Sequence, residues 1–164
     1  MIVSQPSILD RAVVVGLPSQ LSYVMQLQRR WSQELGFIPR AGLRRALSEK
    51  RVLVVRENRW PAGYVLWTRG RRGILHIAQA AVEVELLRSK LGSELLGAMR
   101  LAARDGGYSI VRLLCREELE ANGFWGDAGF VRTGVLSYAT SRGRRLNEWT
   151  LQLEDCRCVA SVRA

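Results

Sequence analysis

The sequence predicts a single α/β domain with a mixed central sheet of six to seven strands flanked by about four helices. Apolar runs bounded by turn residues, such as 51–57 and 74–82, have the length and composition of strands. In 18–35 and 91–104, apolar residues recur at helical spacing. The strand at 74–82, the helix at 91–104 and a second strand at 109–115 form a succession typical of a parallel crossover unit.

The first half of the chain reads as strands and helices in alternation. A strand at 12–16 ends at Gly16, and a helix from Pro18 or Ser19 to about Leu35 has one apolar stripe, which Gly36 ends. A second short helix is expected at 41–49. The strands 51–57 and 62–68 form a hairpin around a turn at 58–61, and another turn at 69–73 leads to the central strand.

The second half begins with the strand 74–82, which is nearly apolar on both sides, as expected of a central strand. The helix 91–104 ends at Gly106-Gly107. After the strand 109–115 we expect a helix at 117–125 and a hairpin of strands 130–140 and 146–153 around 141–145. Residues 1–153 are therefore expected to form one domain, and 154–164, which lack a clear period, a flexible tail.

Composition narrows the functional classes. No apolar run approaches the ~20 residues of a membrane span, and the N-terminus has no signal-peptide pattern. Three cysteines form no disulfide framework or metal-ligand set, which favours a reducing, cytoplasmic setting. The formal net charge of +10 comes almost entirely from arginine. It favours anionic partners by long-range attraction, although a solvated basic surface explains it equally well.

The loop between the strand 74–82 and the following helix is the first candidate site. A strand that turns into a helix presents unpaired backbone N–H groups at the helix start, and the helix dipole adds to their attraction for anions. Arg88, Lys90 and Gly92 in this loop would strengthen the attraction. The stretch therefore predicts a pocket for a phosphate-bearing ligand.

Two motifs resemble the GCN5-related N-acetyltransferase (GNAT) superfamily over roughly residues 12–153. The first motif of the family is a strand ending in Val, then Arg/Gln-x-x-Gly-x-Gly/Ala, then a helix. Here Val82 lies ten residues before Gly92, as the pattern requires. The chain departs from the pattern at two positions, with Leu87 in place of the Arg/Gln and Lys90 in place of the first glycine. The second motif is Ala121-Asn-Gly-Phe-Trp-Gly-Asp-Ala-Gly-Phe130, followed by Gly134. The stretches 79–82 and 119–125 are similar to those of GNAT proteins of phages and mobile elements.

The resemblance implies an acyl-CoA-dependent N-acyltransferase that uses acetyl-CoA or another acyl-CoA. The residues that it places at the cofactor lie at the strand end, in the loop and near the second motif: Ala80, Ala81, Val82, Leu87, Arg88, Ser89, Lys90, Leu91, Gly92, Ser93, Glu118, Asn122, Phe124 and Trp125. A backbone N–H within 79–82 would polarise the thioester carbonyl. Trp125 stands where many relatives have a tyrosine acid, and an indole N–H cannot take that role.

Acyl transfer to an amine needs a general base, because only the neutral amine attacks the carbonyl. The candidates are His76, Glu83 and Glu85, and Tyr138 is a distant substitute acid. His76 has a suitable ordinary pKa, but its mid-strand place favours a core or surface histidine. The two glutamates could equally be solvated loop charges.

The acceptor side is expected to involve Gln79, Trp31, Phe37 and the hairpin arginines Arg142, Arg144 and Arg145. Arginines with nearby aromatic residues suit an amine on DNA, RNA or another anionic acceptor. No nucleic-acid-binding motif accompanies them. The alternative function is a non-catalytic module on the same fold that binds nucleic acid or a protein partner. In either case the protein is expected to be a monomer or a homodimer. No metal site is expected.

Overall fold

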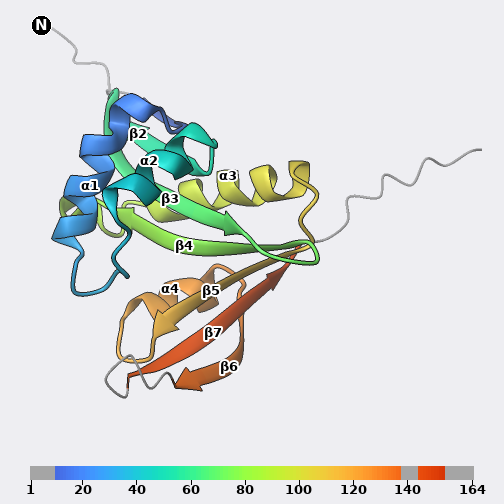
Figure 1. Ribbon diagram of the computed structural model, residues 1–164. Helices are drawn as coiled ribbons and strands as arrows, with labels where there is room; N and C mark the ends of the chain where they lie inside the picture. Colours follow the sequence, from blue (N-terminus) through green and yellow to red (C-terminus); the bar gives the residue numbers. More distant parts are fainter. Residues whose placement is uncertain (1–9, 138–143, 154–164) are drawn as a thin grey trace, which may run out of the picture. The chain divides into compact units, whose positions relative to one another are not determined.

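The computed structural model of the protein (Figure 1) describes residues 10–137 and 144–153. Within these ranges the fold has seven strands and four α-helices, which confirms the predicted α/β class. The chain divides into two compact units, residues 1–68 with 76–99 and residues 69–75 with 100–164. None of the helices in the described ranges is long and apolar enough to cross a membrane.

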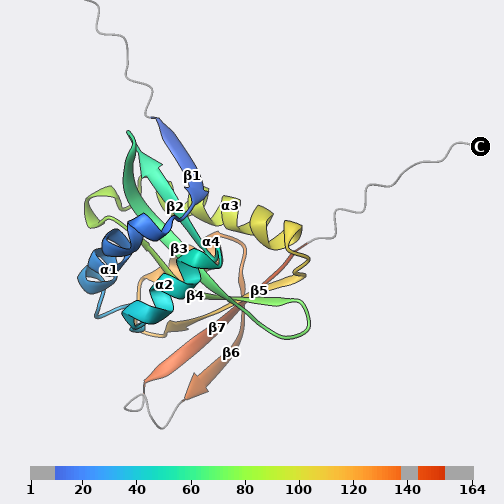
Figure 2. The same cartoon turned by 45° about the horizontal axis from the view of Figure 1, so that its top comes forward.

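The first unit contains β1 (Arg11–Val15), β2 (Val52–Glu57), β3 (Trp60–Arg69) and most of β4 (Ile74–Val82). β1 pairs antiparallel with β2, and β2 with β3. The strand order of the sheet is β1-β2-β3-β4, followed by the strands of the second unit in the order β5-β7-β6. The helices α1 (Leu21–Arg30) and α2 (Arg40–Ser48) lie on one face of β2 to β4 (Figures 1 and 2), and most of α3 (Leu91–Asp105) lies on the other.

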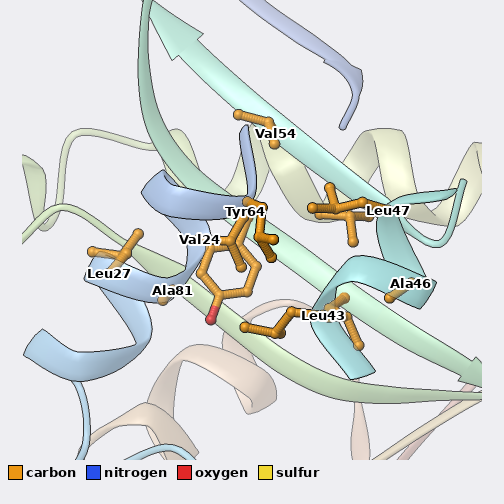
Figure 3. Close-up of a cluster of buried hydrophobic side chains, with 11 residues drawn as sticks. Val24, Leu27, Leu43, Ala46, Leu47, Val54, Tyr64 and Ala81 are labelled. Carbon is orange, nitrogen blue, oxygen red and sulfur yellow. The ribbon is translucent and has the colours of Figure 1, made fainter. Parts of the chain in front are cut away.

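Apolar side chains from α1 and α2 meet those of the sheet in a buried core (Figure 3). Val24 and Leu27 of α1 and Leu43 of α2 are at most 1% exposed, and they pack with Val54 and Tyr64 of the strands. The apolar positions of each helix fall on one face because the spacing follows the helical period. This core fixes the place of the segment that joins α1 to α2.

The prediction of a helix at 18–35 is wrong at both ends. Residues Pro18–Gln20 form the 3-10 helix η1, and α1 ends at Arg30. The side chain of Gln28 explains the early end, because it accepts from the backbone N–H of Ile38 (2.9 Å) and donates to its carbonyl (3.1 Å). This pair of bonds folds the chain back onto α1, and such a long-range contact outweighs the local helical pattern.

The hairpin turn between β2 and β3 is shorter than predicted, because β3 already begins at Trp60. Asn58 and Arg59 alone form the turn, both with positive φ (50° and 71°). Positive φ at both central residues is the geometry of a two-residue hairpin turn whose twist matches that of the strands. Asn is well suited to this conformation.

The second unit contains β5 (Ile110–Arg116), α4 (Ala121–Asp127), β6 (Val131–Ser137) and β7 (Arg145–Gln152). β7 pairs antiparallel with both β5 and β6. The helix expected at 117–125 begins four residues later, at Ala121. The side-chain amide of Asn122 donates to the carbonyls of Arg116 and Leu119, both at 2.8 Å, and these bonds hold the intervening residues in a turn.

Candidate active site: an open helix start and a clamped loop

The connection from β4 to α3 passes through the 3-10 helix η2 (Val84–Leu86) and a loop with an unusual backbone. Arg88 and Lys90 have positive φ values of 65° and 69°. For residues other than glycine this left-handed conformation is unfavourable. Lys90, which stands where the family has glycine, therefore adopts a backbone geometry that glycine would adopt more easily.

The first turn of α3 leaves backbone donors unpaired. The carbonyl of Lys90 accepts from Glu94 N–H at 3.0 Å, the first bond of the helix. Within the described residues, the N–H groups of Lys90, Leu91, Gly92 and Ser93 have no hydrogen-bond acceptor. Unpaired N–H groups at a helix start, reinforced by the helix dipole, form a site for phosphate oxygens. The side chains of Arg88 and Lys90 are exposed and add positive charge beside it.

Ser89 is held inside this loop. Its hydroxyl donates to the carbonyl of Leu86 at 2.5 Å, and its own carbonyl accepts from Arg11 of β1 at 2.9 Å. The predicted cofactor residue Leu87 is 49% exposed, whereas Leu91 is 1% exposed and belongs to the core. In this segment the backbone and the two cations, rather than the apolar side chains, are placed to meet a ligand.

Residues predicted near the cofactor in the second unit have structural partners. The side-chain oxygen Oδ1 of Asn122 accepts from the side-chain amide of Asn147 at 3.0 Å and from the indole N–H of Trp149 at 2.9 Å. Its amide is occupied by backbone carbonyls, so Asn122 is fully engaged in fixing the start of α4. Glu118 is exposed and pairs with Arg116 at 3.3 Å.

Trp125 is a core residue of the second unit. Only 7% exposed, it packs edge-on between Phe124 and Phe130, with ring centroids 5.0 and 5.4 Å away. Edge-to-face packing of this kind stabilises a core beyond simple burial. Burial also raises the pKa of the nearby Cys115 thiol to about 11, so this thiol is protonated at neutral pH and is no nucleophile.

On the α1–α2 side, Gln79 of β4 lies at the centre of a buried polar network. It is 2% exposed, accepts from the hydroxyl of Tyr64 at 2.8 Å and donates to the side chain of Gln28 at 2.7 Å and to the carbonyl of Gly36. The network clamps the segment after α1 to β4. Burial raises the pKa of Tyr64, so its hydroxyl remains a donor.

The clamped segment presents Phe37, whose side chain is 80% exposed. Of the predicted acceptor residues Phe37, Trp31 and Gln79, only Phe37 is free to contact a ligand by stacking. Trp31 packs against the core, and its indole N–H donates to the carbonyl of Val82 at 2.9 Å.

The end of β4 carries Glu83, one of the predicted bases. Its carboxylate accepts from Arg30 at 2.5 Å, and its side chain is 18% exposed. The buried hydroxyl of Tyr23 lies close by, and burial together with the charge of Glu83 raises the pKa of Tyr23. Glu83 is thus fixed in position, whereas Glu85 is exposed and has no partner among the described residues.

The remaining predicted residues lie elsewhere. His76 is half-buried on β4, and because side chains alternate along a strand it lies on the opposite face from Gln79. Alternation likewise places Ala80 with His76, and Ala81 in the core with Tyr64. Arg144 is exposed, and Arg145 pairs with Glu117 at 3.5 Å. Tyr138 and Arg142 lie outside the described residues.

Sequence reasoning missed Arg11, Gln28 and Tyr64, whose contacts hold the loop and the network. Each lies far along the chain from its partner, by 78 residues for Arg11 and Ser89 and by 51 for Gln28 and Gln79. The one signal available was a polar residue on an apolar stripe, at Gln28. No comparable signal existed for Arg11, whose role depends on strand pairing.

An open helix start after a central strand, with a clamped segment on the other side of that strand, is an arrangement of α/β domains that suits a phosphate-bearing ligand. The sequence profile of the acetyltransferase (GNAT) domain matches residues 26–140. The chain belongs to this acetyltransferase family, as its motifs predicted, and is an N-acetyltransferase by class.

Solved structures share the fold at low sequence identity. Ard1 from Thermoplasma volcanium superposes with a TM-score of 0.79 at 19% identity, covering 88% of this chain and 99% of that one. The putative acetyltransferase yncA from Salmonella typhimurium, solved with acetyl-CoA, has a TM-score of 0.76 at 16% identity, over 89% and 95% of the two chains.

Rv2747 from Mycobacterium tuberculosis, solved in complex with CoA, has a TM-score of 0.76 at 16% identity, covering 87% of this chain and 99% of that one. These neighbours' ligands agree with the predicted acyl-CoA cofactor. A search of curated protein sequences finds no match.

Proposed function

We propose that this protein transfers an acetyl group from acetyl-CoA to an amine and that the open start of α3 binds the pyrophosphate of the cofactor. The observation that carries the proposal is the set of unpaired N–H groups at residues 90–93, flanked by the exposed cations Arg88 and Lys90. Four converging donors with two cations suit a ligand that carries two linked phosphates.

Acetyl-CoA supplies an acetyl group activated as a thioester. The amine nitrogen forms a bond to the acetyl carbon, the carbon–sulfur bond breaks, and the proton lost by the amine passes to a base while the sulfur leaves as a thiolate. We assign the base to Glu83, acting through water, because its carboxylate is fixed at the end of β4 by Arg30 yet retains access to solvent.

The acceptor is proposed to be an amine on an anionic molecule, such as a nucleic-acid base of the kind suggested by the resemblance to phage proteins. Phe37 is exposed on the clamped segment, and Arg29, Arg40 and Arg44 on α1 and α2 are exposed without partners among the described residues. An exposed ring on the segment that joins two helices with exposed guanidinium groups favours a base and its phosphates.

Thermal unfolding with increasing acetyl-CoA tests the cofactor site. A ligand that binds only the folded chain stabilises it by about 2.7 kcal/mol at a hundredfold excess over Kd, so the midpoint is expected to rise by several degrees. Gly92→Leu places a side chain over the open N–H groups and is expected to abolish the rise. Gly97→Leu is the matched control, because a Cβ at Gly97 of the same helix meets no other atom within 4 Å.

Acetyl transfer is followed by mass spectrometry with amines on nucleosides, oligonucleotides and peptides. Glu83→Gln is expected to keep the shift caused by acetyl-CoA and to lose transfer at least tenfold, in line with the usual contribution of a general base. No shift of the wild-type midpoint at millimolar acetyl-CoA would contradict the enzyme function and favour the non-catalytic module.

A further inference from the structure

Arg11 of β1 joins three parts of the first unit at the open start of α3. Its guanidinium donates to Glu57 of β2 at 2.8 and 3.0 Å, to the carbonyl of Ser89 at 2.9 Å and to the carboxylate of Glu94 at 3.1 Å. Glu57, and then Glu94, raise the pKa of Arg11, so it is charged at every physiological pH.

The bond to Ser89 has a specific consequence for the helix start. In a continuous α-helix the carbonyl of Ser89 would accept from the N–H of Ser93, four residues later. Here Ser89 lies before the helix, because Lys90 has a positive φ, and Ser93 N–H, like the other N–H groups of the first turn, has no acceptor among the described residues. Arg11 binds the carbonyl of Ser89 and so ties the residue before the helix start to β1, which fixes the loop beside the open N–H groups.

The contact with Glu94 has a second consequence. Glu94 lies in the first turn of α3, where the dipole stabilises its negative charge but where that charge also repels a phosphate. Its side chain is 39% exposed, and Arg11 is its only ion-pair partner within the described ranges. Arg11 thereby offsets the one carboxylate in the first turn beside the open N–H groups.

We propose that Arg11 is a positioning residue for the anion site: it fixes the loop before α3 by binding the carbonyl of Ser89, and it neutralises Glu94 beside the bound phosphates. The inference rests on the proposed function, because it assigns Arg11 a part in binding the pyrophosphate. Arg11 does not need to touch the ligand for this role. Glu57, opposite Arg11 in the β1–β2 pairing, anchors the guanidinium.

Calorimetric titration with CoA tests the inference without requiring turnover. Arg11→Gln is expected to weaken CoA binding about tenfold, equivalent to about 1.4 kcal/mol and to one charge-assisted hydrogen bond. Arg45→Gln is the matched control, because it removes an arginine that pairs only with Glu49 on α2. Its CoA affinity is expected to equal that of the wild type.

Two further measurements separate positioning from a general structural role. With S-acetyl-pantetheine, an acetyl thioester without the pyrophosphate, kcat/KM is expected to be the same for Arg11→Gln and the wild type. Adding Glu94→Gln to Arg11→Gln is expected to recover part of the lost CoA affinity, because the uncompensated carboxylate is gone. If Arg11→Gln does not fold, Glu57→Gln, which keeps the arginine but removes its anchor, is expected to weaken CoA binding by a few-fold.

Each outcome has a distinct meaning. Unchanged CoA affinity in Arg11→Gln, or equal losses with acetyl-pantetheine and with acetyl-CoA, overturns the role of Arg11 while leaving the proposed function intact. If Arg11→Gln does not fold, unchanged CoA affinity in Glu57→Gln overturns the role of Arg11. A wild-type chain that does not bind CoA overturns both.

Discussion

Lys90 and Arg88 adopt a backbone conformation that side chains disfavour, in the loop where the ligand is proposed to bind. The left-handed region costs a non-glycine residue roughly 1–2 kcal/mol, and such strain persists where the surroundings fix the backbone. Here the surroundings are the bonds of Ser89 to Leu86 and to Arg11 on one side and the first helical bond at Lys90 on the other. At Lys90 the chain therefore holds a left-handed backbone and carries a cation.

Replacing Lys90 by glycine and by alanine separates these two effects. At an ordinary helix or loop position glycine is less stable than alanine by about 0.5–1 kcal/mol. At Lys90, with φ of 69°, the order is expected to reverse, so that Lys90→Gly has the higher free energy of unfolding by about 1 kcal/mol. Both variants lose the same charge, so their affinities for acetyl-CoA are expected to be equal to each other and lower than that of the wild type.

Denaturant unfolding of the two variants measures the difference. A higher stability for Lys90→Ala than for Lys90→Gly would show that residue 90 does not hold a positive φ in solution. Gly107, which has a φ of 77°, offers a positive control, since Gly107→Ala is expected to be destabilising for the same reason.

At the scale of elements, the segment between α1 and α2 is positioned by buried polar bonds together with the packing of Trp31, Leu35 and Ile38 against the core. Gln79 connects β4 to α1 through Gln28, to β3 through Tyr64 and to the segment through Gly36. Buried polar groups that lose a partner are destabilising, by about 1–3 kcal/mol each. The network therefore fixes one arrangement of the segment and presents Phe37 in a defined place.

Gln79→Leu is expected to lower the free energy of unfolding by roughly 2–4 kcal/mol, because it leaves several buried polar groups without partners. Acetyl-CoA affinity is expected to remain within a few-fold of the wild type, whereas KM for the acceptor should rise. Gln26→Leu, on the exposed face of α1, is the matched control. An unaltered stability of Gln79→Leu would contradict the network.

At the scale of the whole molecule, the formal net charge of +10 provides a long-range attraction for anions. Some of the arginines form ion pairs with carboxylates, and eight such pairs lie among the described residues. Arg11, Arg30 and Arg45 are examples. Arg40 and Arg44, like several other arginines, have no ion pair in the described ranges. Both lie in the first half of α2, directly after the segment that carries Phe37, so we choose them to test the proposed recognition of a polyanion.

Binding of a duplex or single-stranded oligonucleotide is expected to weaken as salt rises, because each neutralised phosphate releases a counterion. The double variant Arg40→Gln/Arg44→Gln is expected to lower the slope of log K against log salt by roughly two. Arg45 pairs with Glu49, the residue that follows α2, so Arg45→Gln is expected to leave the slope nearly unchanged. Equal affinities at about 50 and 200 mM salt would contradict the proposed anionic acceptor.

Local patterns were sufficient for much of the secondary structure. The strand 74–82 was predicted with the bounds of β4, and the helix 91–104 differs from α3 by one residue. Both have long, uniform patterns, apolar in the strand and with a 3.6-residue period in the helix. The predicted C-terminal end of α1 and the predicted start of α4 were wrong because the side chains of Gln28 and Asn122 form bonds that no local pattern contains.

The sequence by itself determined the α/β class, the family and the position of the loop between β4 and α3 where we propose the anion binds, since these depend on periodicity, spacing and the residues around Gly92. The tertiary structure alone decided which predicted residues are available to a ligand. It engaged Gln79, Trp31 and Asn122 in internal hydrogen bonds, left the N–H groups of 90–93 unpaired and brought Arg11 to the helix start. The physical reason is that a hydrogen-bonding group is satisfied by whichever partner folding brings near, and strand pairing brings together residues that are far apart in the chain.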